Sequence, residues 1–423
     1  EGERGADVPA RTSTVYRIGS VTKQFTSALV MREAEAGKLA LDDSVQQYVP
    51  GFDTHGERVT LRELLTLTGG VPNYTSDSTF ERRMTLDLPD SAVLAMGERD
   101  SLDFEPGTRW SYSNTDYYLL GLVLEKVTGR PYGELVEDSL AAPLGLGHTS
   151  YCWNAPLVPG RAEGYAASDS LPGRGKLGKP VLVNAGPLSM KLPGAAGALC
   201  STVGDLVRWT RLLHAGKVVS PASFRAMTTP ATLPDGLSTH YGFGLFMGEL
   251  GGHRYVWHNG GINGFLTSVA RYPDDDLTVV VLSNSTSVGP DRLQAEIARY
   301  ALGIPAPPSE PEPLPGGLAG RVAGTYRMVA NGARIVVSAG AEGDSLTATA
   351  EGLMGPRPVP LTYVGGAGSG QAEFLLGPPS GPRLVFGLPA TGRGPARHVT
   401  FRAGLAEIEG LRVEGGGGSA GGS

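Results

Sequence analysis

The sequence is poor in lysine and cysteine, and it has no hydrophobic run long enough to span a bilayer. Only seven of its 36 basic residues are lysines, its net charge is −6, and no block of basic residues occurs. This charge balance argues against nucleic acid or an anionic membrane as a partner. Because a membrane-spanning helix needs about 20 mostly apolar residues, no transmembrane segment is expected.

Cysteine is too sparse to define a disulfide framework, and histidine is too sparse to define a metal site. Cys152 and Cys200 are the two cysteines, and we favour two buried thiols over a single bridge, with both alternatives open. Their state therefore assigns no cellular compartment. The seven histidines are scattered and form no HExxH motif, so neither a metal nor another cofactor is expected.

Proline and glycine divide the chain. The segment 304–317, IPAPPSEPEPLPGG, is too rich in proline for a helix or a central strand and is expected to be a linker. It separates a domain of mixed patterns at 1–303 from a β-rich domain at 318–414. Short strand-like runs in the latter predict a small antiparallel barrel or sandwich. Glycine and serine are typical of a flexible tail at 415–423.

The hydrophobic period changes along residues 1–303. Three strand-like runs occur within 253–284, with a turn at Pro273–Asp276. Helices on an antiparallel sheet, with a helical block between, predict an α+β fold. Helical patterns cover 21–37, which is expected to be amphipathic, and 58–70, 115–129, 203–216 and 289–303.

A serine lies three residues before a lysine where the first helical pattern begins. In Ser20-Val21-Thr22-Lys23 the serine is either an ordinary N-cap or a nucleophile. At a first helical turn its Oγ lies near the positive end of the helix dipole, and Lys23 projects from the same face. A desolvated Lys23 amine would lose its proton near neutral pH and act as the base for Ser20.

A second candidate element is Tyr112-Ser113-Asn114, which is followed by an apolar helical pattern. It is either an ordinary loop or a source of a phenol and an amide. A phenol can transfer a proton if a neighbouring cation lowers its pKa. The amide of Asn114 can hold both Lys23 and a substrate carbonyl.

The third element, His258-Asn259-Gly260, ends a strand-like run and is followed by Gly261. Glycine here would let a substrate backbone lie against the strand edge. The N–H of Gly261 could then join that of Ser20 as an oxyanion hole. A buried, hydrogen-bonded histidine is the alternative interpretation of His258.

Five segments carry a family resemblance: YRIGSVTKQFTSALVM, VTLRELLTLTGGVPNY, FEPGTRWSYSNTDYYLLG, GALCSTVGDLVRW and WHNGGINGFLTSVARYPDDDLTVVVLSN. Together they resemble the serine β-lactamase-related family, over about residues 14–302. That family includes class C β-lactamases, D-alanyl-D-alanine carboxypeptidases, D-aminopeptidases and esterases. The resemblance implies a transpeptidase-like domain, in which an antiparallel sheet is flanked by helices and accompanied by a helical subdomain.

The resemblance also implies a serine hydrolase that cleaves an amide or ester through an acyl-serine intermediate. Because His258 stands where class C β-lactamases carry lysine, we favour a carboxypeptidase-, aminopeptidase- or esterase-like activity. A true class C-type β-lactamase and a non-catalytic penicillin-binding or sensor protein are the alternatives. The implied catalytic residues are Ser20, Lys23 and Tyr112, and the implied substrate-binding residues are Asn114, His258, Asn259, Gly260 and Gly261.

The same resemblance implies the class of substrate, the cellular location of the protein and the extent of its sheet. The expected substrates are a D-amino-acid peptide, an ester or a β-lactam. Relatives are often exported, which implies a periplasmic or extracellular protein. Only 19 residues precede Ser20, whereas relatives have several tens more. The first strands of the sheet are therefore expected to be missing, which would leave an apolar sheet edge exposed.

Overall fold

The computed structural model describes residues 8–171, 175–351, 357–379, 381–390 and 394–413. The expected glycine-serine tail at 415–423 lies outside these ranges. Two compact units are present. The first comprises residues up to Thr108, Tyr112–Ala231 and His240–Ile304, and the barrel unit comprises Arg109–Ser111, Thr232–Thr239 and the chain from Pro305 onward.

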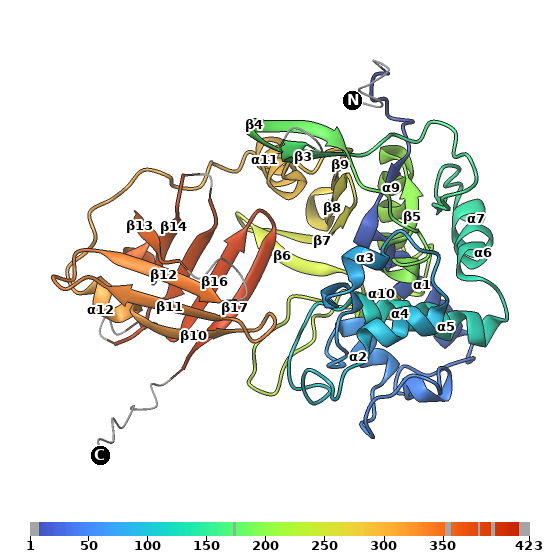
Figure 1. Ribbon diagram of the computed structural model, residues 1–423. Helices are drawn as coiled ribbons and strands as arrows, with labels where there is room; N and C mark the ends of the chain where they lie inside the picture. The colour runs from blue at the N-terminus through green and yellow to red at the C-terminus, as the bar shows by residue number, and fades with distance from the viewer. Residues whose placement is uncertain (1–7, 172–174, 352–356, 380, 391–393, 414–423) are drawn as a thin grey trace. The chain divides into compact units, whose positions relative to one another are not determined.

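The first unit mixes helices with short sheets (Figure 1). Its longer helices coincide with the helical patterns of the sequence. The helices are α1 (Thr22–Glu35), α2 (Leu61–Thr66), α3 (Phe80–Arg83), α4 (Asp90–Gly97), α5 (Asn114–Thr128), α6 (Tyr132–Val136), α7 (Ala142–Leu144), α8 (Gly194–Gly197), α9 (Val203–His214), α10 (Pro221–Met227) and α11 (Pro290–Leu302). The strands are β1 (Tyr16–Arg17), β2 (Ser150–Tyr151), β3 (Tyr165–Leu171), β4 (Gly175–Asn184), β5 (Leu199–Ser201), β6 (Phe246–Leu250), β7 (His253–Ile262), β8 (Phe265–Tyr272) and β9 (Leu277–Ser283).

The main sheet has the antiparallel order β6-β7-β8-β9. Its last two strands are joined by a turn at Pro273–Asp275, close to the predicted turn. Helix α11 packs against β8 and β9, and the short 3₁₀ turn Gly19–Val21 packs against β7 and β8. These contacts confirm the predicted α+β class. They also place the segment that carries Ser20 beside the strand that carries His258.

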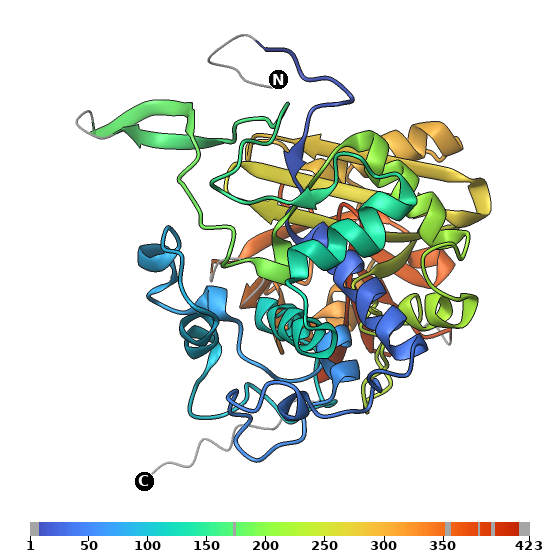
Figure 2. The same ribbon diagram turned by 90° about the vertical axis from the view of Figure 1, so that its right-hand side faces the viewer.

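Helix α1 packs against α5 and α8, and Figure 2 shows it beside α5. The predicted amphipathic pattern is wrong, because every residue from Thr22 to Met31 is buried. Its ring Phe25 stacks on Trp209 of α9, with centroids 3.8 Å apart. Trp209 in turn donates from Nε1 to Gln24 Oε1 at 2.7 Å. Buried polar residues on this helix therefore have partners in the core, which sequence period alone does not reveal.

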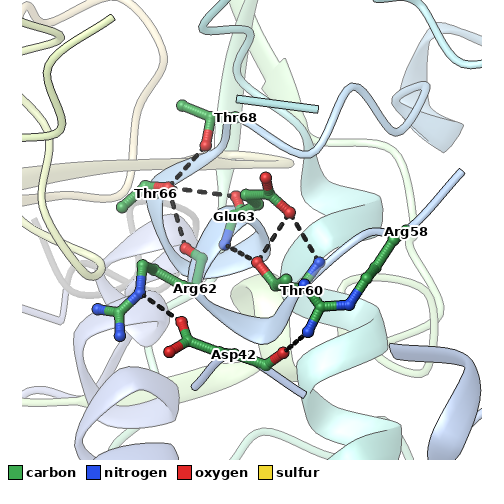
Figure 3. Close-up of polar contacts among 7 residues, drawn as sticks. All are labelled: Asp42, Arg58, Thr60, Arg62, Glu63, Thr66 and Thr68. Carbon is green, nitrogen blue, oxygen red and sulfur yellow. Dashed lines mark hydrogen bonds and ion pairs between the residues drawn. The ribbon is translucent and has the colours of Figure 1, made fainter. Parts of the chain in front are cut away.

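Helix α2 begins with a capping box (Figure 3). The N–H of Glu63 donates to Thr60 Oγ1 at 3.2 Å, and the Thr60 N–H donates back to Glu63 Oε2 at 2.8 Å. Such reciprocal bonds satisfy donors that a helix start leaves free. Near the end of the helix, the Leu65 carbonyl accepts a hydrogen bond from Tyr117 of α5 at 2.8 Å. The cap thus fixes helix α2, whose last turn holds the Tyr117 hydroxyl. The ring of Tyr117 lies 5.5 Å from Lys23 Nζ.

Cys152 and Cys200 form a disulfide bond, which corrects the favoured prediction of two thiols. Cys200 lies on β5, between β1 and β2 in a three-stranded sheet. The bond closes a loop whose ends are 48 residues apart. In the chain-entropy model a loop of that size stabilises the fold by about 4 kcal/mol. The bond therefore ties β5 to the segment that follows β2.

The barrel unit contains a closed eight-stranded barrel in which each strand pairs antiparallel with the next and β10 closes on β17. Its interior is filled with side chains, including Tyr326, Phe374 and Phe386, and helix α12 (Leu318–Val322) adds Leu318 and Val322 to the same core. Of the two predicted alternatives, the barrel is confirmed. The strands are β10 (Gly324–Met328), β11 (Arg334–Ala339), β12 (Leu346–Glu351), β13 (Val359–Gly365), β14 (Gln371–Leu376), β15 (Arg383–Gly387), β16 (His398–Ala403) and β17 (Ala406–Val413).

Candidate active site

Ser20 lies in a tight turn between β1 and α1. The residue before it, Gly19, has φ of 51°, a left-handed conformation that glycine adopts without strain. A Cβ atom at Gly19 would also lie only 2.9 Å from the Gly261 nitrogen on β7. Glycine at this position therefore lets the serine turn approach the strand backbone to backbone.

Lys23 lies one turn further on and is completely buried. Its Nζ lies 3.1 Å from Ser20 Oγ, 2.8 Å from Asn114 Oδ1 and 2.9 Å from the Ala196 carbonyl of α8. The rings of Tyr112 and Tyr117 lie 4.8 Å and 5.5 Å from the same nitrogen. The structure thus brings the predicted nucleophile, its base and the predicted amide together in one cluster.

These contacts define what a neutral Lys23 would do. The Asn114 and Ala196 oxygens can only accept, so they take two N–H bonds of the amine. The lone pair is then left for the hydroxyl of Ser20, which can donate. Burial lowers the pKa of Lys23 well below its usual value, and the nearby charge of Asp116 opposes that shift. The geometry therefore suits a neutral amine that receives the serine proton.

Helix α5 supplies Asn114 at its first position. Ser113 is the N-cap and accepts from the Asp116 N–H at 3.4 Å. The Asn114 backbone N–H donates to Asn73 Oδ1 at 3.2 Å. Asn73 comes from a different segment and was not predicted, because nothing in its local sequence marks it as a partner of α5. Its contact fixes the residue that orients Lys23.

Tyr112 is half-buried and hydrogen-bonds to Ser20. Burial raises the pKa of its phenol, and the bond to Ser20 opposes the shift only in part. The condition set from the sequence, a pKa lowered by a neighbouring cation, is therefore not met in the structure. A phenol that stays protonated at neutral pH is a proton donor rather than a base.

His258 is completely buried on β7. Its Nε2 lies 3.3 Å from the Tyr241 hydroxyl, and its Nδ1 lies 2.5 Å from the Asn259 carbonyl. Its ring centroid is 6.4 Å from that of Tyr112. Burial, with a smaller effect from Lys23, lowers its pKa to about 3. The imidazole is neutral across the physiological range and carries no positive charge for a substrate.

Asn259 points away from this cluster. Successive side chains of a strand alternate between the two faces of the sheet, and Asn259 Nδ2 donates to Asp291 Oδ2 of α11 at 2.8 Å. Its predicted substrate-binding role would therefore need the backbone rather than the amide. The sequence motif alone does not show which face of the sheet α11 covers.

Gly260 and Gly261 run alongside the serine turn. A Cβ atom at Gly260 would lie 1.9 Å from the Ile18 carbonyl oxygen and 3.1 Å from the Ser20 nitrogen. At Gly261 the nearest atom to such a Cβ would be Leu266 Cδ2, at 3.4 Å. Gly260 is thus required by a close backbone contact, whereas a side chain at Gly261 would meet only Leu266.

Asp116 is a charged neighbour that sequence reasoning missed. It is 1% exposed, and its Oδ1 has no hydrogen-bond partner within the part of the chain that the structure describes. Burial raises the pKa of this carboxyl well above its usual value, and the charge of Lys23 opposes that shift. An acidic residue in the first turn of a helix is common, so its position in the sequence gave no distinct signal.

Acid pH should destabilise the protein through His258. A histidine whose folded pKa is about 3, below the unfolded value, contributes stability above about pH 6.5 and loses it as the pH falls. Between pH 6.5 and 4.5 the loss should be about 2 kcal/mol. Urea unfolding at several pH values should show a shallower pH dependence for His258→Gln. The exposed His148→Gln control should keep the wild-type slope, and an equal slope in all three proteins would refute the assignment.

Two kinds of feature are missing from the described ranges. No group of three or more histidine, cysteine, aspartate or glutamate side chains there is arranged to hold a metal ion. None of the helices described is long and apolar enough to cross a membrane.

The chain is similar to known proteins of one family. The family model described as Beta-lactamase matches residues 2–303. Penicillin-binding protein 4* of Bacillus subtilis is 31% identical over 290 residues, covering 65% of this chain and 62% of the relative. The chain spans between about half and three fifths of the curated relatives it matches.

Solved structures agree with this assignment. A D-stereospecific amidohydrolase from a Streptomyces species is 28% identical with a TM-score of 0.59, covering 68% of this chain and 87% of the other. An octameric penicillin-binding protein homologue from Pyrococcus abyssi has a TM-score of 0.62 and covers 97% of this chain and 91% of its own. At 23% identity it supports the fold alone. With the family model covering more than half of its length, this chain belongs to the Beta-lactamase family.

Proposed function

We propose that the protein is a serine hydrolase that cleaves an amide or ester bond through an acyl-serine intermediate. The observation that carries the proposal is the environment of Lys23. Its buried nitrogen meets two obligate acceptors and the Ser20 hydroxyl. That arrangement directs a neutral amine at the nucleophile without any change of rotamer.

In the proposed acylation, Ser20 Oγ forms a bond to the substrate carbonyl carbon, and its proton passes to Lys23 Nζ. The carbonyl oxygen becomes an oxyanion, for which the backbone N–H groups of Ser20 and Gly261 are the candidate donors. When the C–N or C–O bond breaks, Tyr112 gives its phenolic proton to the leaving group. Lys23 then returns a proton to Tyr112, so that charge and protons balance.

In deacylation, water takes the place of Ser20 as the nucleophile, and Ser20 becomes the leaving group. Water attacks the acyl carbon, loses a proton to the same Lys23–Tyr112 pair, and releases the acid with regeneration of the Ser20 hydroxyl. Asn114 holds the amine through both half-reactions, because its Oδ1 is committed to Lys23. Its Nδ2 donates to Asn73 Oδ1 at 3.5 Å, and the second hydrogen of that amide is a candidate donor to the substrate carbonyl.

Among the substrates considered, we propose amides and peptides of D-amino acids. The similarity to a D-stereospecific amidohydrolase at 28% identity supports this class. A β-lactamase of class C would present a lysine cation at position 258, whereas the buried His258 is neutral. That difference removes a cation that a β-lactam carboxylate would meet, so β-lactam turnover is the second candidate.

The test combines stereochemistry with mapping of the acyl group. Hydrolysis of D-phenylalanine amide should exceed that of the L-amide by at least tenfold. After brief exposure to benzylpenicillin or p-nitrophenyl acetate, the added mass should map to Ile18–Lys23, the peptide that trypsin releases by cutting after Arg17 and Lys23. An adduct on another peptide, or no reaction with any of the four compounds, would contradict the proposal.

We further propose that residues 1–303 form the hydrolase domain and residues 318–414 an accessory domain, and that the protein is exported. The disulfide supports an oxidising location, because such bonds persist outside the cytosol. Fractionation of the producing cells should place the protein in the periplasm or the medium. Recovery from the cytosol alone would refute export.

A further inference from the structure

A cavity of about 460 Å³ in the first unit has two arginines in its wall. Arg17 comes from β1 and Arg161 from the segment before β3, and the other polar lining residues include Glu163, Asn154 and Asn263. We call it the Arg17–Arg161 cavity. Its volume lies in the range typical of small-molecule sites, and none of the steps proposed above uses it.

The guanidinium of Arg17 lacks a partner. Its Nε is inaccessible to solvent and forms no hydrogen bond, and no ion pair to Arg17 occurs among the described residues. Burial, followed by the charge of Arg161, lowers its pKa, and Glu163 opposes this only in part. Two like charges facing one cavity cost free energy unless an anion lies between them.

The backbone holds both arginines in place. Arg17 faces Cys200 across the β1–β5 pair. The Arg161 Nη1 lies 4.0 Å from Cys152 Sγ, and its backbone bridges to Val15. The disulfide therefore links Cys200, which pairs with Arg17, to Cys152, which lies beside Arg161. It keeps the two arginines close to each other.

Two amides of the cavity wall are already occupied, and a third belongs to the exposed Asn184. Asn154 donates to the Leu188 carbonyl at 2.8 Å and accepts from the Met190 N–H at 2.7 Å. Asn263 donates to the Gly186 carbonyl at 3.1 Å. The two guanidinium groups are the charged donors of the cavity wall, and Arg161 Nη1 also contacts the Trp153 carbonyl at 3.4 Å. Together with Glu163 they give the cavity a net charge of about +1.

We propose that the Arg17–Arg161 cavity binds a small organic carboxylate, held by the planar forks of the two guanidinium groups. A fork of parallel N–H bonds matches a carboxylate in geometry. A single positive charge in excess favours a monoanion over the dianion of phosphate. The inference does not depend on hydrolysis at Ser20, although Arg17 lies on the strand that leads to that residue.

Calorimetric titration of the full chain at low salt tests the proposal, with N-acetylglycine as probe and N-acetylglycinamide as its uncharged match. The acid should bind with one-to-one stoichiometry, and the amide and inorganic phosphate should each bind at least tenfold more weakly. Arg17→Gln and Arg161→Gln should each weaken binding of the acid at least tenfold. The control Arg292→Gln removes a surface arginine paired with Glu296 and should bind like the wild type.

The thermal midpoint provides a second readout. The acid should raise it in the wild type and in Ser20→Ala but not in the two cavity variants. Without ligand, Arg161→Gln should unfold near the wild-type temperature. It removes the repulsion with Arg17 together with two long contacts of Nη1, to the Trp153 carbonyl at 3.4 Å and to Cys152 Sγ at 4.0 Å. If Arg17→Gln fails to fold, Arg161→Gln carries the test. Equal binding of acid and amide, tighter binding of phosphate, or unchanged binding in Arg161→Gln would each overturn the proposal.

Discussion

Replacing Ser20 with alanine should reduce turnover by at least about 10⁴-fold, because covalent catalysis loses its nucleophile. Lys23, Asn114 and the strand glycines remain in Ser20→Ala, so substrate should still bind. The free energy of unfolding should change by less than about 1 kcal/mol, since the Ser20 side chain is small and half-buried. Initial rates and the burst of an activated ester measure the effect.

A second serine gives a matched control. Ser220 is the N-cap of α10, where its Oγ accepts from the Ser223 N–H at 3.2 Å. Ser220→Ala should cost about 1 kcal/mol of stability and leave turnover unchanged. A wild-type burst in Ser20→Ala would refute the assignment of the nucleophile, whatever the control shows.

Gly260→Ala should damage both the fold and the site. The added methyl would lie 1.9 Å from the Ile18 carbonyl oxygen, which is backbone and cannot rotate away. We expect a loss of roughly 3 kcal/mol of stability as the serine turn and β7 separate. Turnover should fall by about 100-fold, because a shift of about 1 Å misaligns the nucleophile. Denaturant unfolding and initial rates measure the two effects.

Gly261→Ala is the matched control for stability. Its methyl would meet Leu266 Cδ2 at 3.4 Å, an ordinary contact. It should therefore change the free energy of unfolding by less than about 1 kcal/mol. If Gly260→Ala proved as stable as Gly261→Ala, the inference that the backbone contact with the serine turn excludes a side chain at position 260 would be refuted.

Hydrophobic period was sufficient to predict the main helices, three of the four strands of the main sheet and the barrel, but it missed β6. It failed for α1, where Thr26 and Ser27 look like a polar face. In the structure Thr26 contacts the Tyr132 hydroxyl at 2.7 Å and Ser27 contacts that of Tyr117 at 3.2 Å, both inside the core. It also missed the β3–β4 hairpin, whose mostly exposed side chains show no buried face to alternate with. Period reports burial, so it fails where a buried residue is polar or a strand is exposed.

The residues of the candidate site could be predicted where they belong to short sequence motifs. Ser20, Lys23 and Asn114 meet as expected, although the assigned roles of all the site residues remain predictions. What spacing does not give is the partner from a distant segment, such as the Ala196 carbonyl at Lys23. Proton transfer by Tyr112 was made conditional on a neighbouring cation that lowers its pKa, whereas burial raises that pKa. Electrostatic surroundings depend on tertiary packing, which a three-residue motif does not encode.

The disulfide has a practical consequence for anyone who produces the protein. The Cys152 N–H donates to the Ala198 carbonyl at 2.8 Å, two residues after the carbonyl that holds Lys23. Chains made in a reducing cytosol would carry two thiols and a looser attachment at this point. Preparations that differ in redox history would then differ in specific activity while having the same sequence and purity. Titration of free thiols should therefore accompany every rate measured for this protein.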